Sequence, residues 1–413
     1  NIPYPCPYGE LPETVRAAQF LRTSAVESSA SQLQPGWKMG GLQLGCIGNS
    51  TDVFSGGSGS VERGAQKSRE ERRDILKLKL GVVGLRYGET AIGDLLNSPD
   101  AEKYELTKVF DLDREKVARV SEKYNVRGAS SLEEMLQDGT VDVIGLFTPP
   151  AGRAKLLEQI LLAGKDVMTT KPFEMDPDEA ERVLELSRKK GRVLHVNSPG
   201  ICESGVLSEM RSYAEKYDFG QPVGARCDVW VNYHEKADGG WYDDPEKCPV
   251  APVFRLGIYI INDLIRLFGK PSEVSVLSSR ISTGRPTPDN SQLSMLFENG
   301  ALANIYASFC VDDGQRYKGP MIINYERGTF YYNVFPHQEQ RLTAVRKMTE
   351  NNPIQEEWNI CGFGSGHYYW DIFYESVQKR QIIPQKYEAE ILWGVKVLRA
   401  MKESNLQGRK IIL

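Results

Sequence analysis

The feature that most constrains the fold is a regular alternation of apolar strands and helical segments between residues 77 and 197. Short apolar runs, such as Lys77–Val83 and Tyr104–Phe110, are followed by stretches whose apolar residues recur at helical spacing. Strands separated by helices of this length pair in parallel through right-handed crossovers. The alternation therefore predicts a doubly wound α/β domain of the Rossmann type, which binds ligands where its strands end.

The expected strands of this domain are Lys77–Val83, Tyr104–Phe110, Val141–Phe147, Asp166–Thr170 and Arg192–Val196. The expected helices are Thr90–Asn97, Arg114–Tyr124, Leu132–Gln137, Ala151–Ala163 and Pro177–Lys190. Because parallel strands end at one edge of their sheet, the residues that follow each strand are the first candidates for a binding site.

Beyond Asn197 the chain favours long extended segments joined by tight turns such as Glu298-Asn299-Gly300. Hairpin-linked strands predict a second α/β domain with a large, mostly antiparallel, open-faced sheet. Its expected strands are Pro222–Tyr233, Glu273–Thr283, Leu293–Phe297, Ala301–Cys310 and Met321–Asn333. The helices expected to cover one face are Val253–Phe268, Tyr368–Arg380 and Ala389–Glu403.

Residues 1–76 differ from the rest in composition, with several prolines and the Gly/Ser-rich stretch Ser55–Ser60. Such a segment buries little surface, so it is either a disordered leader or an arm that orders on the body or on a neighbouring subunit. Apolar residues such as Trp37 favour the arm. We expect three parts: an extension (1–76), a Rossmann domain (77–197) and a substrate and oligomerisation domain (198–413) whose last helix packs back on the Rossmann domain.

Charge and composition exclude several classes of protein. A net charge of −4 gives no broad cationic field, so we expect no nucleic-acid partner. No apolar run approaches the length of a membrane span. The start of the chain shows no leader, which favours a cytoplasmic protein. Because the chain does not begin with Met, a leader that has already been removed is the alternative. Seven scattered cysteines without a CxxC pair predict no metal site.

The turn after the first expected strand is the first candidate site. It reads Gly81-Val-Val-Gly84-Leu-Arg86-Tyr87-Gly88, and a glycine turn that opens a helix offers backbone N–H groups to a pyrophosphate. Arg86 and Glu89 interrupt the usual glycine spacing, so an ordinary strand–helix turn is the competing interpretation. Arg86 also has the chemistry to pair directly with a phosphate.

Asp111 follows the second expected strand, 27 residues after Gly84. An acid at this place accepts hydrogen bonds from the adenosine ribose and repels a 2′-phosphate, which favours NAD over NADP. The competing interpretation is a helix N-cap, a role for which Asp113 is equally available.

Two further strand ends carry candidate residues. Thr148-Pro149-Pro150 follows one buried strand, where the prolines hold the loop rigid, and Lys171-Pro172 follows the next. A lysine near a nicotinamide can hydrogen-bond a substrate hydroxyl and ease its deprotonation during hydride transfer.

In this order, the glycine turn, Asp111, Thr148-Pro149-Pro150 and Lys171-Pro172 resemble the glucose–fructose oxidoreductase / inositol dehydrogenase (Gfo/Idh/MocA) family. The resemblance runs from about Lys77 to the end of the chain. It implies a Rossmann domain that binds NAD or NADP and a C-terminal α/β domain with a mostly antiparallel sheet. It also implies sugars, inositols or related polyols as substrates, and homo-oligomers (dimers or tetramers) formed through the open sheet face.

Several positions depart from the family pattern. The usual E-K-P is Thr170-Lys171-Pro172, and Arg153 stands where the family generally has histidine, near the cofactor. The second motif, D-x-G-x-H-x-x-D, corresponds to Arg255-Leu-Gly-Ile-Tyr259-Ile-Ile-Asn262. Tyrosine with asparagine three residues later is similar to the glucose–fructose oxidoreductase branch.

The catalytic residues implied are Lys171, Tyr259 and Arg255. We expect Lys171 to polarise the substrate hydroxyl and Tyr259 to take the proton, because a neighbouring cation lowers the pKa of a tyrosine. Arg255 replaces a carboxylate with a cation, which would suit an anionic substrate or a changed chemistry.

Other residues are candidates for contacts with substrate. Aromatic rings stack on sugars, although core packing is the commoner use of each ring, and a helix cap is an equal alternative for the histidine. The expected substrate-binding residues are Lys171, Asn197, Trp241, Tyr242, Arg255, Tyr259, Asn262 and His367. The expected cofactor-binding residues are Gly84, Arg86, Tyr87, Gly88, Asp111, Thr148, Pro149, Arg153 and Lys171.

Three functions fit these residues. The first is an NAD(P)-dependent oxidoreductase that transfers hydride between the nicotinamide and a sugar or polyol. The second keeps the nucleotide bound and uses transient oxidation to cleave a glycoside or drive an elimination. The third is a non-catalytic nucleotide-binding or assembly protein with the same fold.

Overall fold

A computed structural model describes residues 76–413, apart from His234, Gln315, Arg316, Lys318, residues 335–339, Glu350, Cys361 and Phe363. The expected extension, residues 1–76, lies outside the described residues except for Leu76. Residues from Ile75 to Leu413 form one unit by their contacts, within which we keep 77–197 and 198–413 as working domain boundaries.

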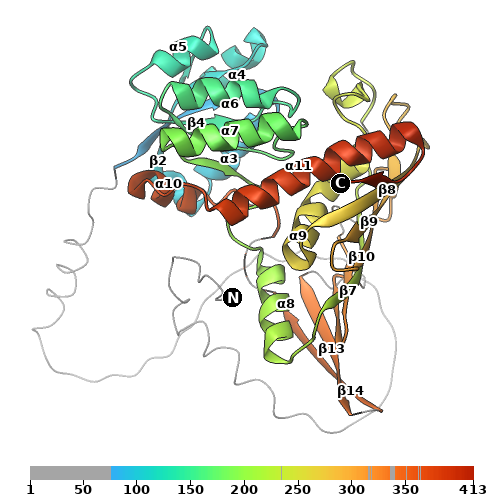
Figure 1. The fold of residues 1–413 in the computed structure, drawn as a ribbon. Coiled ribbons are helices and arrows are strands. Elements are labelled where there is room, and N and C mark those ends of the chain that lie inside the picture. The colour runs from blue at the N-terminus through green and yellow to red at the C-terminus, as the bar shows by residue number, and fades with distance from the viewer. Residues whose placement is uncertain are drawn as a thin grey trace, which may run out of the picture. The chain divides into compact units, whose positions relative to one another are not determined.

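A six-stranded parallel sheet forms the first half of this unit (Figure 1). Its strands are β1 (Leu78–Val83), β2 (Tyr104–Phe110), β3 (Arg127–Gly128), β4 (Val143–Leu146), β5 (Asp166–Thr169) and β6 (Leu194–Val196). The order β3-β2-β1-β4-β5-β6 is that of the dinucleotide-binding Rossmann fold, which confirms the predicted fold class. Every residue of β4 and β5 is buried, as expected for central strands covered on both faces.

The connecting helices are α3 (Leu85–Leu96), α4 (Arg114–Tyr124), α5 (Leu132–Gln137), α6 (Arg153–Leu162) and α7 (Pro177–Lys190), with a 3₁₀ turn at Pro99–Lys103. Their ends follow local chemistry. Asp113 and Asp176 accept hydrogen bonds from the first free N–H groups of α4 and α7, and both helices end at a residue in the left-handed conformation.

The first helix begins earlier than predicted. The expected start was Thr90, whereas α3 starts at Leu85, directly after Gly84. Gly84 has a φ of +86°, which lets the chain turn from strand to helix without intervening loop residues. Arg86 and Tyr87 therefore lie in the first turn of α3 and not in a loop.

The second half is built on a nine-stranded sheet. Its strands are β7 (Pro222–Trp230), β8 (Pro271–Ser279), β9 (Asn290–Phe297), β10 (Leu302–Ser308), β11 (Met321–Tyr325), β12 (Gly328–Tyr332), β13 (Arg341–Thr349), β14 (Asn352–Asn359) and β15 (Ile411–Ile412). The strand order is β14-β13-β12-β11-β7-β10-β9-β8-β15, and the described pairs are antiparallel except for β7 with β10. The mostly antiparallel sheet was predicted.

Two details of that sheet were not predicted. The expected single strand Met321–Asn333 is a hairpin of β11 and β12, because Glu326 and Arg327 form a turn between them. The hairpin of β13 and β14 was missed entirely, since its exposed face is rich in Lys, Glu and Asn and its apolar alternation is weak.

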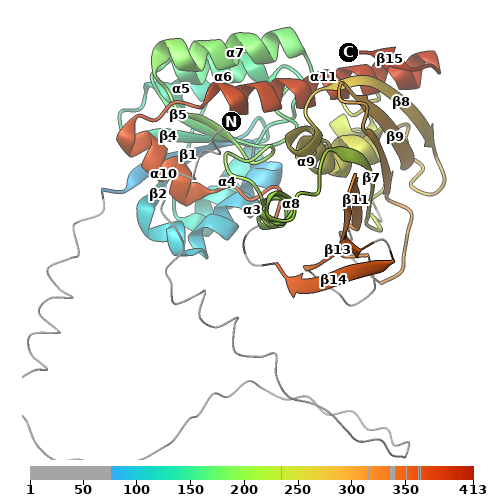
Figure 2. The ribbon, with the colours of Figure 1, turned by 60° about the horizontal axis from the view of Figure 1, so that its bottom comes forward.

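Helices α8 (Gly205–Lys216) and α9 (Ile258–Phe268) lie against the nine-stranded sheet, and one π-helical turn, Val253–Gly257, precedes α9 (Figure 2). Helix α10 (Trp370–Lys379) does not cover this sheet as expected. It packs on the Rossmann domain, where the Tyr104 hydroxyl donates to the carbonyl of Trp370 at 2.6 Å.

The last helix, α11 (Gln385–Gln407), contacts both halves (Figure 1). The hydroxyl of Tyr387 donates to the carbonyl of Val196, at the end of β6, at 3.0 Å. Further along, the hydroxyl of Ser404 accepts from the N–H of Val276 in β8 at 3.1 Å. Between these points Glu390 forms an ion pair with Arg266 of α9 at 2.6 Å, with 12% and 7% of the side chains exposed.

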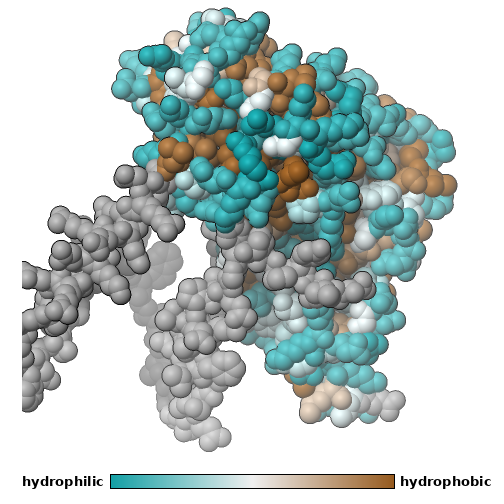
Figure 3. All heavy atoms as spheres, turned by 60° about the vertical axis from the view of Figure 1, so that its left-hand side comes forward, coloured by the Kyte–Doolittle hydropathy of each residue, from teal (hydrophilic) through white to brown (hydrophobic). Residues whose placement is uncertain are grey.

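The surface of the described residues is mixed in polarity. On the face that Figure 3 displays, hydrophobic patches are interrupted by hydrophilic side chains, as on ordinary protein surfaces. Within residues 76–413, no described helix is both long and apolar enough to span a bilayer. The described residues also contain no group of three or more His, Cys, Asp or Glu side chains able to hold a metal ion.

We predict that Glu390→Ala lowers the free energy of unfolding by about 3 kcal/mol, because it leaves the Arg266 guanidinium buried without its counter-ion. Urea denaturation followed by circular dichroism measures this change. Glu185→Ala is the control: its pair with Lys189 is exposed, so the expected loss is at most about 0.5 kcal/mol. Equal losses in the two variants would contradict the role of α11 as a buried connection.

Candidate functional site

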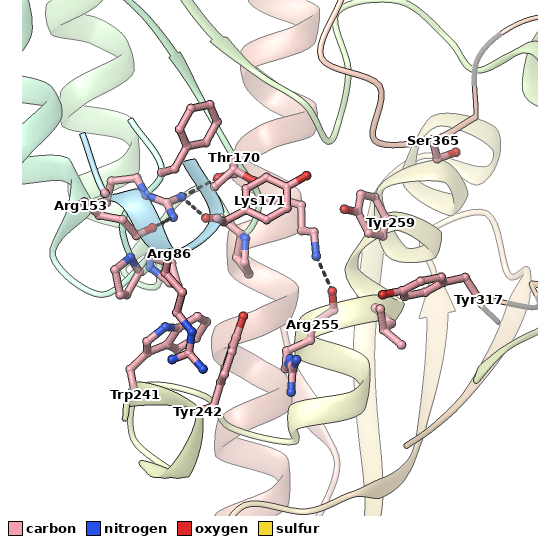
Figure 4. Close-up of a pocket in the computed structure, with 18 of the residues that line it drawn as sticks. Arg86, Arg153, Thr170, Lys171, Trp241, Tyr242, Arg255, Tyr259, Tyr317 and Ser365 are labelled. Atoms are coloured by element: carbon pink, nitrogen blue, oxygen red, sulfur yellow. Dashed lines mark hydrogen bonds between the residues drawn. The ribbon is translucent and has the colours of Figure 1, made fainter. Parts of the chain in front are cut away.

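A cavity of about 1110 Å³ opens at the carboxyl ends of the parallel strands. One wall comes from the turns that follow β1, β2, β4 and β5, and the other from the π-helical turn, α9 and the loop around Trp241 (Figure 4). This volume exceeds that of most small-molecule sites and suits a long ligand with a second molecule beside it. The position agrees with the general rule for ligands of open α/β sheets.

The turn at Gly84 fits a dinucleotide phosphate. A Cβ atom at Gly84 would lie 2.8 Å from the carbonyl oxygen of Phe147, so β1 and β4 approach closely only because the residue is glycine. The start of α3 then faces the cavity, which places backbone N–H groups and the positive end of the helix dipole there. Gly88 has a packing role instead, since its Cβ would meet Val82 and Phe147.

Asp111 also lies in the cavity wall. Its carboxylate accepts hydrogen bonds from the N–H of Leu85 at 2.6 Å and from the N–H of Asp113 at 2.9 Å. Asp113 is the N-cap of α4, so the capping role that competed for Asp111 belongs to its neighbour. The carboxylate is thus fixed beside the start of α3, where a ribose would lie.

Arg86 crosses the cavity instead of turning back to the start of its own helix (Figure 4). Its guanidinium donates to Asp238 at 3.2 Å and lies 4.9 Å from the ring centre of Tyr242. About half of this side chain is exposed, so the pair is screened by solvent and adds little stability. Arg86 therefore connects the phosphate turn to the loop of the second domain.

Arg153 organises the loops that follow β4 and β5. Its side chain is 1% exposed, and its guanidinium donates to the carbonyls of Thr148, Thr170, Pro172 and Phe173. Burial lowers the pKa of Arg153 to about 10. Because its two Nη groups donate to the backbone, Arg153 fixes the loops after β4 and β5; it also lines the cavity, and the expected contact with the cofactor stays a prediction.

Lys171 lines the cavity at the end of β5 and is half-buried. Its amine donates to the main-chain carbonyl of Arg255 in the π-helical turn, and its backbone N–H donates to the side chain of Asn197 at 2.8 Å. Burial lowers the pKa of Lys171 to about 7, and the positive charges of Arg255 and Arg153 act in the same direction. Near neutral pH this amine exists in both its neutral and its charged forms.

Tyr259 faces Lys171 from α9, with its ring centre 4.3 Å from the amine (Figure 4). The segment at Gly366 holds the ring in place, because a Cβ there would lie 2.4 Å from it. Burial raises the pKa of Tyr259 well above its usual value, contrary to the expected lowering by a cation. Burial is the largest cause, and the amine of Lys171 contacts the ring.

The side chain of Arg255 turns away from Lys171. It forms a two-point ion pair with Glu235 at 2.7 and 2.9 Å, and its guanidinium lies 3.8 Å from the ring centre of Tyr242 and 4.6 Å from that of Tyr233. These contacts raise the pKa of Arg255 against the effect of burial. The guanidinium is therefore already paired within the protein, by Glu235.

Several expected residues do not line the cavity. The amide of Asn262 donates to the hydroxyl of Ser198 at 2.9 Å within the core, and the amide of Asn197 supports the backbone at Lys171 and Gly366. The ring of His367 packs against Tyr369 at 4.7 Å. Trp241, Tyr242, Tyr87, Thr148 and Pro149 do line it.

Three residues of the site were not predicted from the sequence. Glu235 and Arg285 belong to an ion network around Arg255, and Asp263 lines the cavity one helical turn after Tyr259. Only Asp263 carried a usable signal, since residues four apart share a helix face. The others sit in loops, whose course the sequence does not reveal.

The fold and the cavity are those of a two-domain enzyme that binds a dinucleotide. Residues 78–198 match the family model described as "Oxidoreductase family, NAD-binding Rossmann fold", and residues 207–331 match the "GFO/IDH/MocA C-terminal domain". The two matches cover more than half of the 413 residues. The chain belongs to the Gfo/Idh/MocA family, and it is an NAD(P)-binding oxidoreductase, as the resemblance implied.

Curated relatives are similar over most of the described chain. The uncharacterized oxidoreductase YdgJ of Escherichia coli (strain K12) is 24% identical over 293 residues, which cover 68% of this chain and 77% of YdgJ. The scyllo-inositol 2-dehydrogenase (NADP(+)) IolW of Bacillus subtilis (strain 168) is 26% identical over 302 residues, which cover 70% of this chain and 76% of IolW.

Solved structures share the fold at low identity. A levoglucosan dehydrogenase in complex with NADH and L-sorbose has a TM-score of 0.66 at 15% identity, covering 81% of this chain and 98% of that one. GenD2 from gentamicin A biosynthesis, in complex with NAD, has a TM-score of 0.66 at 18% identity, covering 82% of this chain and 96% of that one.

We predict that Gly84→Ala weakens NAD binding at least tenfold. The new Cβ would clash with the backbone of Phe147, and the alanine would have to keep a positive φ that is unfavourable for it. Isothermal titration with NAD measures the affinity. Gly93→Ala, in the same helix, is the control: its Cβ meets only the Tyr124 hydroxyl at 3.6 Å, so NAD affinity stays unchanged and the helix gains slightly in stability. Unchanged affinity in Gly84→Ala would contradict the assigned phosphate turn.

Proposed function

We propose that the protein oxidises a secondary alcohol of a neutral sugar or polyol and uses NAD as the hydride acceptor. The observation that carries the proposal is the buried amine of Lys171, whose pKa of about 7 allows proton transfer near neutral pH. Asp111 beside the start of α3 supports NAD over NADP. The names of relatives such as the scyllo-inositol 2-dehydrogenase support the substrate class.

The walls of the cavity support a neutral substrate. Arg255, whose positive charge had suggested an anionic substrate, is paired with Glu235, so its charge is balanced within the protein. Trp241 and Tyr317 line the cavity and offer aromatic surface for the C–H face of a sugar. A balanced charge with aromatic walls is suited to an uncharged, hydroxylated ring.

In the proposed reaction, the neutral amine of Lys171 accepts the proton of the substrate hydroxyl. NAD, when bound in the groove above the strand ends, supplies the acceptor for the hydride that leaves the same carbon. Tyr259 keeps its proton because of its raised pKa, so it donates a hydrogen bond to the substrate oxygen instead of acting as the base. The carbonyl of Arg255 holds the amine in position. This assignment reverses the roles first expected for Lys171 and Tyr259.

The first test is turnover of Lys171→Ala. NADH formation at 340 nm is measured with a panel of inositols and aldoses, and we expect kcat/KM to fall by about 10²–10⁴-fold in the variant, because the proton acceptor is gone. NAD should still stabilise the variant against heat as it does the wild type. Lys155→Ala, at an exposed lysine of α6, is the control and should retain full activity.

Two outcomes would contradict the proposal. One is activity of Lys171→Ala within tenfold of the wild type. The other is a wild-type protein that binds NAD but forms no NADH with any member of the panel.

The second test is the pH dependence of each direction. Oxidation needs the neutral amine, so we expect its kcat/KM to fall about tenfold per pH unit below pH 7. Reduction of the ketone needs the charged amine, so its kcat/KM should fall above pH 7. A common pKa near 10 for both directions would contradict a Lys171 amine that titrates near neutral pH as the proton carrier.

A further inference from the structure

The cavity wall also carries four polar residues that the proposed reaction does not use, a group that we call the polar arm. They are Asp263 of α9, Ser365, Asn333 and Tyr332. Figure 4 shows Ser365 beyond Tyr259, on the side away from Arg86 and Trp241. Ser365 is hydrogen-bonded to Asp263, and Tyr332 interacts with both Asn333 and Asp263, so a carboxyl, a hydroxyl, an amide and a phenol are neighbours in the cavity wall.

The position of Asp263 follows from the geometry of α9. Asp263 is four residues after Tyr259, so both side chains lie on the same face of the helix, about 6 Å apart along its axis. This separation is comparable to the width of a six-membered sugar or cyclitol ring. A ring whose reacting hydroxyl lies at Lys171 and Tyr259 can therefore present another hydroxyl to Asp263.

The hydrogen-bonding capacity of Asp263 is not used up by contacts that stabilise the fold. It is 8% exposed and accepts a hydrogen bond of 2.5 Å from the hydroxyl of Ser365, and it forms no ion pair with any described residue. The buried Asp289 is different: it is 1% exposed and accepts from the backbone N–H groups of three successive residues, 281–283. Asp263 thus keeps hydrogen-bonding capacity that faces the cavity.

A second group in the arm has the same property. The side-chain oxygen of Asn333 is buried and accepts no hydrogen bond within the described part of the chain. A buried polar atom without a partner costs free energy unless a ligand or water satisfies it.

Burial also raises the pKa of Asp263 to about 7, so near neutral pH its carboxyl can donate as well as accept.

We propose that Asp263, Ser365 and Asn333 form a second hydroxyl-binding subsite, which selects cyclic polyols by a hydroxyl distant from the oxidised carbon. This inference rests on the proposed function, because it assumes that the same ring reaches Lys171. The other two groups of the subsite are uncharged and the nearby Arg266 is already paired with Glu390, so we expect a neutral hydroxyl as the ligand.

Binding is the first test. Thermal unfolding of the protein with NADH is measured with and without myo-inositol, scyllo-inositol or D-glucose. For at least one of them we expect a rise in Tm in the wild type that is lost in Asp263→Ala and partly kept in Asp263→Asn, whose amide still pairs with Ser365. The rise in Tm caused by NADH alone should be the same in all three proteins. No polyol-dependent rise in the wild type, or an equal rise in Asp263→Ala, would overturn the subsite.

Turnover of deoxy analogues is the second test. With the best substrate, Asp263→Ala should lower kcat/KM about 10- to 100-fold, the effect of one hydrogen bond to a charged group. One monodeoxy analogue should show the same loss with the wild type and no further loss with the variant. Losses of equal size for every analogue in Asp263→Ala would contradict direct recognition of a hydroxyl.

Asp289→Asn is the matched control, since it neutralises a buried aspartate outside the cavity. It should lower Tm and leave the discrimination between analogues unchanged. The two proposals fail separately: polyol binding through Asp263 without NADH formation refutes the proposed oxidation, whereas NADH formation unaffected by Asp263→Ala refutes the subsite. A preference for amino sugars over neutral polyols also overturns the subsite as described.

Discussion

The enclosure of the Lys171 amine is the constraint on which the rest of the site depends. An ammonium group removed from water is costly, so the protein either neutralises it or supplies acceptors. Here the carbonyl of Arg255 is the acceptor, and it comes from a π-helical turn, a distortion that recurs at functional sites. Arg153 fixes the strand ends around the lysine through backbone carbonyls alone. The result is an amine placed without a carboxylate partner among the residues that the structure describes.

Three departures from the family pattern have the same effect on the charge of Lys171. Thr170 in place of glutamate removes a negative charge next to Lys171, and its hydroxyl accepts instead from Tyr368 at 2.9 Å. Arg153 and Arg255 each add a positive charge that lowers the pKa of the lysine. All three changes favour the neutral amine near pH 7. These departures from the family pattern therefore agree with the proposed proton transfer.

Much of the fold was predictable because the signals are local. Strand β2 and helices α4, α5 and α7 have the predicted ends, since Asp113, Ser131 and Asp176 cap the helices through nearby backbone groups. The cavity position followed from the strand ends. The direction of each side chain did not, because it depends on distant partners: Glu235 turns Arg255 away, and backbone carbonyls from two loops occupy Arg153.

The most direct test is the ionisation of Lys171 itself. With ¹⁵N-labelled lysine, the Nζ resonance that disappears in Lys171→Arg can be assigned and its chemical shift followed from pH 5 to pH 11. The account predicts a midpoint near pH 7, well below that of an exposed lysine. A midpoint near pH 10.5 would show that the amine stays charged under working conditions, and would contradict Lys171 as the proton acceptor.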